Sequence, residues 1–389
     1  MMASWENVEL GSICEVVRGG SPRPIIDYIT DEPDGVNWLK IGDVKETDKF
    51  FTHAKEKIKR SGIPKTREVN VGDLILSNSM SFGRAFITLI DGYIHDGWLR
   101  LRCDESRLDK EYLYYFLTSS LAQIQFKAIA TGSVVNNLKS DTVKAIRIDL
   151  PSLEEQKKIA GVLSMLDDKI KCNEVINENL LQQAQTLYKE RFVDMRPFDG
   201  VMPADWHLGT VKEIIELHDS KRIPLSSRER ANLAKIYTYY GATSVMDYVD
   251  RYLFDGIYLL LGEDGTVVDS KGFPILQYVE GKFWVNNHAH IITGKNGFTV
   301  ETLYLLFSLT NVQSIVTGAV QPKISQANLN KVPVIIPSEA ELLAFDSIVK
   351  PIFAQIRNLR TENKRLATVR DTLLPRLMSG ELEVSNIDL

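Results

Sequence analysis

The segment LPSLEEQKKIAGVLSMLDDKIKCNEVINENLLQQAQTLYKERF, residues 150–192, has the most regular apolar spacing in the chain. Ser152 stands where a helix N-cap is expected, and Glu155, three residues later, completes a capping box. From there, apolar residues recur at the heptad spacing of a coiled coil. We expect one helix over about 153–192, roughly 60 Å long at about 1.5 Å per residue, which needs a partner helix to cover its apolar side. The predicted seam residues are Ile159, Leu163, Leu166, Ile170, Asn177 and Leu180.

The same pattern returns later in the chain, where residues 317–378 lie over residues 131–192 at a constant offset of 186, without a gap. A repeat of this length indicates a duplicated domain rather than a solenoid. The second copy predicts a second long helix, and two such helices favour an antiparallel pair related by an approximate two-fold axis. The seam residues predicted in the second helix are Phe345, Val349, Ile352, Ile356, Asn363 and Leu366.

Three details make the helix prediction more specific. Extending the strict heptad places Leu187 and Arg191 in the seam of the first helix. Asn177 and Asn363 occupy the same heptad position, where a buried amide either fixes the register or is tolerated at a wet seam. Pro351 removes a backbone hydrogen bond, so the second helix is expected either to kink there or to begin about one residue before it.

Matches upstream of each helix have shifting offsets: Trp5 falls opposite Trp206 at an offset of 201, and Glu111 opposite Glu301 at 190. Loops of variable length between fixed elements explain this shift. We therefore predict an α+β protein, with two similar modules and two long helices that form an antiparallel coiled coil, in a pseudo-two-fold internal repeat. The predicted segments are a first module over 1–150, a first long helix over 151–194, a linker and second module over 195–336, a second long helix over 337–378, and a tail over 379–389 packing near the first module.

Short apolar runs with alternating or continuous hydrophobicity predict the strands of the modules, in mostly antiparallel, loop-rich sheets. The first module is expected to have strands at Gly72–Ser77, Phe86–Ile90 and Trp98–Arg102, then a helix over 109–128. The second is expected to have strands at Gly256–Leu261, Phe283–Val285 and His290–Thr293, then a helix over 299–313. Residues 280–282 are typical of a hairpin turn, and residues 379–384 of a helix stop followed by a short strand.

Composition limits the class of protein. The 389 residues are 44% hydrophobic and 25% charged, which is ordinary for a folded chain with room for two or three domains. Apolar runs are too short to span a bilayer and the first residues do not resemble a signal peptide, so we expect a cytoplasmic protein. Cys14, Cys103 and Cys172 form no CxxC pair and are expected to be reduced packing residues.

The net charge of −5 argues against indiscriminate binding of nucleic acid, so contacts with DNA must come from local clusters. Basic residues gather near residues 55–67 and 221–230, and polar turns suited to reading base edges lie elsewhere in both modules. The competing explanation is that these are solvated loops, because turns favour Asn, Ser and Gly for backbone reasons. The DNA-binding candidates are Arg18, Ser21, Arg23, Lys57, Lys59, Arg60, Lys65, Arg67, Asn78, Ser79, Ser81, Arg84, Asn136, Asn137, Lys221, Arg222, Arg228, Arg230, Asn286, Asn287, Gln321 and Lys323.

Signatures of catalysis are mostly missing from the sequence. It contains no phosphate loop, dinucleotide fingerprint, zinc-protease motif or nucleophile elbow, and no methyltransferase [DNS]PP[YFW] motif. His288 and His290 would share one face of a strand, but no third metal ligand is evident, so a metal site is not favoured. Asp269, Glu280 and Lys282 fit the D…ExK spacing of metal-dependent nucleases, a pattern that also arises often by chance.

The layout resembles the specificity subunit of Type I restriction-modification systems. The resemblance covers essentially the whole chain and rests on the Trp-led module starts, the loops TGSV (131–134) and TGAVQP (317–322), the helix entry LPSLEEQKKIA (150–160) and the two long helices. In the second copy the helix entry has drifted to IPSEAE (336–341).

That resemblance implies a DNA-binding subunit without catalytic activity, whose two modules are target-recognition domains that each recognise one half of a bipartite asymmetric site. It further implies that two methyltransferase subunits dock on the helical spacer and that restriction and translocase subunits join through them. S-adenosylmethionine, ATP and magnesium would then belong to the partner subunits, and this chain would hold no cofactor.

A helical pair of about 60 Å also limits how far apart two recognition modules can lie, so the helices would act as a ruler between the half-sites. Three alternatives stay open at this point. The first is the recognition subunit of a two-part restriction enzyme, whose partner fuses nuclease and methyltransferase. The others are a stand-alone nuclease using the D…ExK residues and a coiled-coil scaffold whose modules bind protein.

Overall fold

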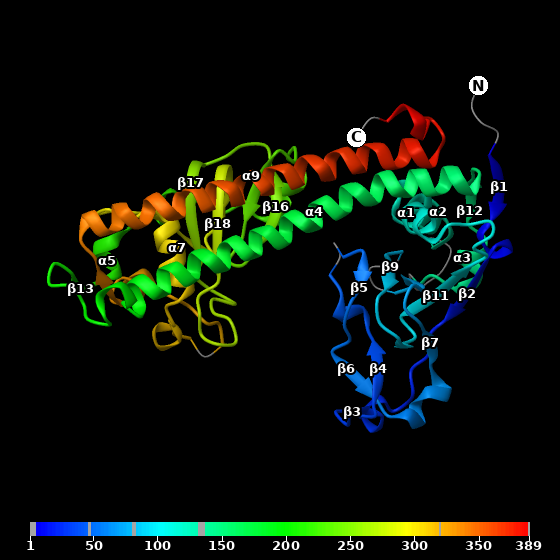
Figure 1. Ribbon diagram of the computed structural model, residues 1–389, viewed down its shortest axis with the longest axis horizontal. Helices are drawn as coiled ribbons and strands as arrows, with labels where there is room; N and C mark the ends of the chain where they lie inside the picture. The colour runs from blue at the N-terminus through cyan, green and yellow to red at the C-terminus, as the bar shows by residue number, and fades with distance from the viewer. Residues whose placement is uncertain (1–4, 46–47, 80–82, 131–136, 319, 388–389) are drawn as a thin grey trace. The chain divides into compact units, whose positions relative to one another are not determined.

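The computed structural model describes residues 5–45, 48–79, 83–130, 137–318 and 320–387. The chain forms two compact units, and neither is a continuous segment. The first unit combines Met1–Lys171 with Glu362–Leu389, and the second is Cys172–Thr361. Each long helix therefore contributes one part to each unit: α4 spans Leu153–Tyr188 and α9 spans Glu339–Met378 (Figure 1).

Two five-stranded sheets form the globular part of the first unit. A core shared between them is centred on the Trp98 ring, which meets the edges of Phe51 and Phe86. One sheet has the order β2 (Cys14–Arg18), β11 (Trp98–Cys103), β8 (Leu74–Ser77), β9 (Ala85–Thr88) and β5 (Phe50–Phe51). The other has the order β3 (Ile29–Thr30), β6 (Glu56–Ile58), β4 (Val36–Leu39), β10 (Gly92–Ile94) and β7 (Arg67–Val69). The second sheet was not anticipated, because its strands have only two to four residues.

Helices cover one side of the first sheet. The single helix expected over 109–128 is instead two helices, α1 (Lys110–Thr118) and α2 (Ser120–Ala130), because Ser119 is extended and its hydroxyl donates to the Phe116 carbonyl. A short helix α3 (Ser140–Lys144) follows, and β1 (Glu6–Glu9) pairs antiparallel with β12 (Arg147–Leu150). The main core of the unit lies between the sheet, these helices and the first part of α4.

The second unit repeats the framework with one larger sheet. Its six strands have the order β14 (Ile215–Leu217), β19 (Ala289–Gly294), β17 (Phe254–Gly262), β18 (Leu276–Val285), β15 (Tyr237–Tyr240) and β16 (Val245–Val249). A separate pair, β13 (His207–Thr210) with β20 (Pro333–Ile336), corresponds to β1 with β12. The helices are α5 (Val211–Ile214), α6 (Ser227–Ala231), α7 (Val300–Ser308) and α8 (Gln326–Leu329).

Two sequence predictions fail in the second unit. The hairpin turn at residues 280–282 is wrong, because β18 runs straight through it. Gly281 lies opposite Gly256, and both have positive φ (74° and 137°), which glycine tolerates without a steric penalty. The helix expected over 299–313 ends at Ser308, after which the chain forms a 3-10 turn at Gln313–Ile315.

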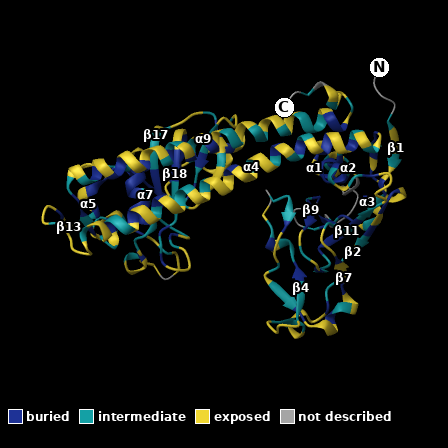
Figure 2. Cartoon of the chain, viewed as in Figure 1, coloured by how far each residue is buried: buried dark blue, intermediate teal, exposed yellow. Residues whose placement is uncertain are grey.

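The long helices pair antiparallel within each unit. In the first unit, Asp167 of α4 bonds Arg370 of α9, and Ile159 and Leu163 share a core with Leu377. In the second unit, Tyr188 packs on Phe345, 5.8 Å between ring centroids. Figure 2 shows buried and exposed residues alternating along both helices, as expected for helices that each bury one face.

The strict heptad fails near the end of α4. Leu187 is 37% exposed, whereas Tyr188 and Phe192 are buried and reach the core of the second unit. A straight α-helix has 3.6 residues per turn, so a seam predicted at 3.5 residues per turn shifts around the helix as its length increases. From Ala184 onward the buried residues are four positions apart, at Tyr188 and Phe192. The α-helix also ends at Tyr188 and is followed by a π-helical turn, Lys189–Val193.

The second helix begins at Glu339 and continues through Pro351, so the predicted start about one residue before Pro351 is wrong.

The two asparagines differ in their surroundings. Asn363 donates from Nδ2 to the Ile170 carbonyl at 3.2 Å, which couples the two helices in the first unit. The Oδ1 of Asn177 is buried and has no hydrogen-bond partner among the described residues.

The chain after α9 returns to the first unit. Gly380 adopts φ of 70° and lies 3.4 Å from Trp5, measured from the position that a Cβ would take. The expected short strand is instead a 3-10 turn, Val384–Asn386, and Leu382, Val384 and Ile387 pack against the main core of the first unit.

Phe192 and Leu187 give a direct test of the seam. Phe192 packs at 4.8 Å on Phe345 and 5.5 Å on Trp206, between ring centroids. We expect Phe192→Ala to lower the free energy of unfolding of the second unit by about 3–5 kcal/mol, since large buried aromatics cost this much when truncated. The matched variant Leu187→Ala should cost about 1 kcal/mol or less. Urea unfolding followed by circular dichroism measures both, and equal losses would contradict the observed seam.

Candidate nucleic-acid interface

Loops that are far apart in the sequence meet around Asp96, in the turn between β10 and β11. The Asp96 carbonyl accepts from Nε of Arg18 at 3.0 Å and from Nδ2 of Asn78 at 2.8 Å. Its carboxylate accepts from the Ser21 hydroxyl at 2.6 Å and from Arg23 at 3.4 Å. Four predicted DNA-binding residues are thus brought together, and all four bond to Asp96, with Arg23 making the longest of these contacts.

Asp96 and its neighbour His95 differ in charge, because the first is ionised and the second is neutral. The hydrogen bond from Ser21 lowers the pKa of Asp96, so the carboxylate is ionised. Burial lowers the pKa of His95, which favours the neutral ring. Backbone amides of Ile41 and Gly97 point at its two nitrogens, at 3.2 and 2.6 Å. A neutral ring accepts only one such bond, and the closer amide of Gly97 is favoured.

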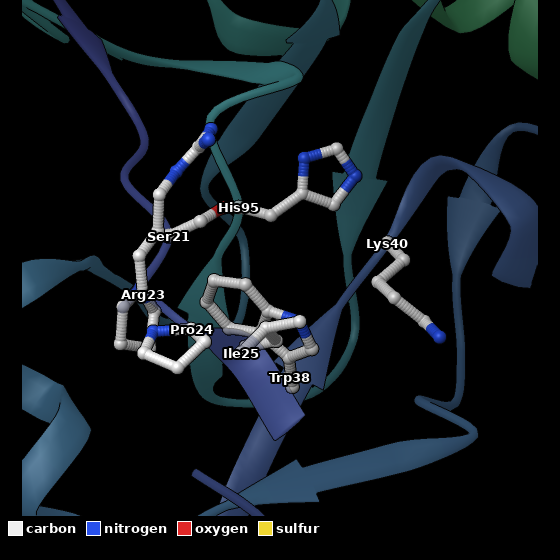
Figure 3. Close-up of a pocket in the computed structure, with 8 residues that line it drawn as sticks. Ser21, Arg23, Pro24, Ile25, Trp38, Lys40 and His95 are labelled. Carbon is white, nitrogen blue, oxygen red and sulfur yellow. The ribbon is translucent and has the colours of Figure 1, made fainter. Parts of the chain in front are cut away.

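A cavity of about 550 Å³ opens beside this turn. Its walls are mostly apolar, and Figure 3 shows Trp38, Pro24 and Ile25 close together, with the His95 ring and the Arg23 guanidinium to one side of them. The Trp38 and His95 ring centroids lie 6.1 Å apart. The lining residues are Ser21, Pro22, Arg23, Pro24, Ile25, Trp38, Lys40 and His95.

The basic cluster of the first unit lies on the sheet that contains β6 and β7 and on the 3-10 turn Arg60–Lys65. Its cationic groups bond mainly to neutral acceptors. Lys59 donates to the Asp27 carbonyl at 2.7 Å, Lys65 to the Tyr28 hydroxyl at 2.6 Å, and Arg67 to the Thr66 carbonyl at 2.7 Å. Neutral acceptors leave the positive charge uncompensated, so these side chains remain suited to phosphate contacts. Lys57 is half-buried on β6, and Arg60 is exposed.

The basic residues of the second unit are used differently. Arg230 is buried at 7% exposure, bonds Asp247 at 3.0 Å and lies over the Tyr239 ring. Arg222 donates to Glu263 at 2.5 Å and to the Ala289 carbonyl at 2.9 Å. We therefore do not expect Arg222 or Arg230 to reach DNA directly. Lys221 and Arg228 are exposed.

A buried charged network links three segments of the second unit. Asp219 and the Ile324 carbonyl flank the two nitrogens of the His290 ring at 2.5 and 2.8 Å, so the ring bridges two oxygen atoms. Gln326 also donates to Asp219, at 2.6 Å. Burial alone would raise the pKa of Asp219, but its hydrogen bonds and His290 lower it overall.

Asp219, Glu263 and His290 have ligand atoms within 4.8 Å of one another. These atoms are already engaged, because His290 bonds Asp219 while Glu263 pairs with Arg222 and, at 3.1 Å, with Lys323. The residues present therefore fit an internal ion network rather than a metal site. His288 is bonded separately to Asp264.

The remaining candidates are scattered. Asn286 is buried and accepts from the His288 amide at 2.8 Å, so it too serves the interior. Asn287 and Gln321 are exposed, while Ser79, Arg84 and Asn137 are half-buried. Ser81 and Asn136 lie outside the described residues, as does the 131–134 loop.

The proposed nuclease residues each have a separate structural partner. The Asp269 carboxylate accepts the backbone amides of Lys271 and Phe273 at 2.8 and 2.9 Å, which caps a turn. Glu280 lies 3.5 Å from Arg357, and the Lys282 ammonium lies 4.7 Å from the centre of the Tyr252 ring. This arrangement does not favour the stand-alone nuclease.

Sequence reasoning missed several residues that organise these sites. The position of Asp96 in a turn could have been predicted, because the Asp96-Gly97 pair is typical of a turn. Trp38, Lys40 and Asp219 had no such signal, since their importance depends on contacts with residues distant in the chain.

Two similar α+β modules with polar, cationic loops, each joined to a long helix, are the features of a modular DNA-recognition protein. Residues 2–182 and 203–369 both match the family described as "Type I restriction modification DNA specificity domain". The chain belongs to this family and contains two copies of its domain. Its role is DNA specificity, and it is a specificity component rather than a catalytic one.

Related proteins and structures agree with this assignment. The Type I restriction enzyme MjaIX specificity subunit of Methanocaldococcus jannaschii is 25% identical, covering 98% of this chain and 94% of the relative. The HindI specificity subunit of Haemophilus influenzae is 22% identical, covering 98% of this chain and all of the relative. The crystal structure of a Type I restriction-modification S subunit from M. genitalium has a TM-score of 0.54 and 18% identity, with 96% of each chain covered, and shows the same fold.

Within the described residues, none of the helices is both long and apolar enough to cross a membrane.

The bond from Ser21 to Asp96 predicts a pH effect. Because the folded-state pKa of Asp96 is lowered, its ionised form stabilises the turn above its ordinary pKa of 3.8, and this stabilisation is lost as the pH falls through the folded-state value. Ser21→Ala should raise the pKa of Asp96, as measured by NMR titration of the carboxyl carbon. Ser106→Ala is the matched control: Ser106 donates to Asp104 at 2.6 Å, so only the pKa of Asp104 should rise. An unchanged Asp96 pKa in Ser21→Ala would contradict the role of this bond.

Asp219 should be critical for the stability of the second unit. Asp219→Ala leaves the buried His290 and the half-buried Arg222 without the carboxylate that contacts them at 2.5 and 3.5 Å. Breaking a buried ion pair typically costs about 3–5 kcal/mol. Glu216→Ala, an exposed carboxylate three residues away, should change the unfolding free energy by about 0.5 kcal/mol or less. Urea unfolding compares the two, and a small loss in Asp219→Ala would show that the network is not stabilising.

Proposed function

We propose that each unit recognises one half of a bipartite, asymmetric DNA site, as a component of a Type I restriction-modification complex. The observation that carries this proposal is the contrast between a repeated framework and divergent globular parts. The framework repeats closely: β1 with β12 corresponds to β13 with β20, and Ile159 and Leu163 are buried as Phe345 and Val349 are.

The globular parts differ where contacts with DNA are expected. The first unit adds a second five-stranded sheet that holds its basic cluster, whereas the second extends one sheet to six strands. Uncompensated cations such as Lys59 and Lys65 suit the first unit to phosphate contacts. In the second unit, exposed polar side chains such as Asn287 and Gln321 are better placed than the paired arginines. Different surfaces on a common framework support two different half-sites.

Partner subunits are proposed to dock on the long helices. Both helices keep several large apolar side chains exposed to solvent, which a partner subunit would cover. These residues are Met165 and Val369 in the first unit, and Val175, Ile176, Leu343 and Ile348 in the second. Two methyltransferase subunits, with restriction and translocase subunits joined through them, would occupy these surfaces. S-adenosylmethionine, ATP and magnesium would be bound by those partners, and this chain would bind none.

Exchange of one module tests the proposal. Cells that express the chain with its methyltransferase partners should methylate a bipartite motif, detectable by methylome sequencing. Replacing residues 201–338 with the corresponding segment of a relative should change one half of the motif and leave the other half unchanged. The converse exchange of residues 1–150 is the control and should change the other half. A motif that is not bipartite, or an exchange that alters neither half, would refute the proposal.

A further inference from the structure

The cavity beside Asp96 has the composition of a site for a flat, partly apolar ligand. Pro22, Pro24 and Ile25 form one part of its wall, with Trp38 and His95 as aromatic members. Its volume of about 550 Å³ lies within the range of roughly 300–1,000 Å³ that is usual for small-molecule sites. Its size and aromatic walls suit a planar ring system better than an extended chain.

Three polar side chains that line the cavity are already engaged, which limits how a ligand can be recognised. The Ser21 hydroxyl donates to Asp96, the His95 ring faces backbone amides, and the Lys40 ammonium pairs with Glu56. A ligand in this cavity would therefore be held by stacking and apolar contact rather than by a pattern of hydrogen bonds. Binding of that kind tolerates different ring identities.

The rim of the cavity supplies a positive charge. The Arg23 side chain is 80% exposed, and its contact with Asp96 is long, at 3.4 Å. An exposed guanidinium beside an aromatic cavity is complementary to a base whose flanking phosphates remain outside.

We propose that this cavity receives one nucleobase of the half-site recognised by the first unit, turned out of the base stack of the DNA. This inference rests on the proposed function, because it places the extruded base within DNA bound by this unit. The base would lie against Ile25, Pro24 and the neutral His95 ring, above Trp38, and Arg23 would contact the adjacent backbone. Because the Ser21, Lys40 and His95 side chains are bonded within the protein, we expect the site to select a position in the DNA rather than a particular base.

A mismatch scan of the wild-type complex is the first test. Duplexes containing the methylated motif are prepared with a mismatch at one position of the first half-site at a time, and binding to the chain assembled with its methyltransferase subunits is measured by fluorescence anisotropy at fixed salt. Extruding a mismatched base costs less, so one position should show tighter binding by about tenfold. The gain should occur for a purine and for a pyrimidine at that position.

Filling the cavity is the second test. Ile25→Trp should abolish the gain from the mismatch, whereas Ile26→Trp, at an adjacent residue that is 76% exposed and does not line the cavity, should retain it. Arg23→Ala leaves the apolar walls intact. It should weaken binding to all sequences and lower the slope of log affinity against log salt by about one.

The outcomes separate this inference from the proposed function. If the complex shows no preference for a bipartite site, the proposed function fails. If bipartite binding holds but no mismatch in the first half-site tightens it, or if Ile25→Trp retains the gain, only the extruded base is refuted. If Ile25→Trp instead prevents assembly with the methyltransferase subunits, the cavity is a protein-docking site, and the inference is equally refuted.

Discussion

Burial of the apolar faces of α4 and α9 is the constraint on which the rest of the structure depends. Helices of 36 and 40 residues are far longer than the roughly 11 to 12 residues typical of globular proteins, and an amphipathic helix in water is stabilised mainly by covering its apolar face. Antiparallel pairing covers these apolar faces within each unit, where the start of one helix lies beside the end of the other. The last residues of the chain therefore belong to the same unit as the first.

A carboxylate at equivalent repeat positions then joins each globular part to the helix that follows it. In the first unit, Glu111 on α1 accepts from Ser164 of α4 and from Lys49 at 3.2 Å, and the Lys49 ammonium also lies over the Tyr115 ring. In the second unit, Glu301 on α7 accepts from Arg357 of α9 at 3.0 Å. Both units therefore have a glutamate at this position, whereas its cationic partner is Lys49 in the first unit and Arg357 in the second. The two units share this contact although their sheets differ. Such a junction fixes a globular part on its own helix by geometry that hydrophobic contact alone does not specify.

The sequence predicted the long helices better than the contacts of the loop residues. Helix burial depends on local spacing, whereas the loop contacts join residues that are far apart in the chain. Heptad spacing correctly placed Ile159, Leu163 and Phe345 in the core, because a helix determines its buried face locally. It failed near Leu187, where a small drift in the period accumulates. The loop candidates were chosen by residue type alone, whereas Ser21 and Arg222 bond residues 75 and 41 positions away. No local pattern distinguishes an arginine that faces DNA from one that faces a buried carboxylate.

The balance of charges in the two units bears on how the chain can bind DNA at all. Lys59 and Lys65 of the first unit are bonded to a neutral carbonyl and a neutral hydroxyl group, whereas Arg222, Arg230 and Lys323 of the second unit are paired with carboxylates. These three side chains of the second unit therefore contribute little to the release of counterions from DNA, and the chain as a whole has a net charge of −5. Under the proposed function, sequence preference in the second unit is expected to come more from DNA shape and from uncharged polar groups than from these paired cations.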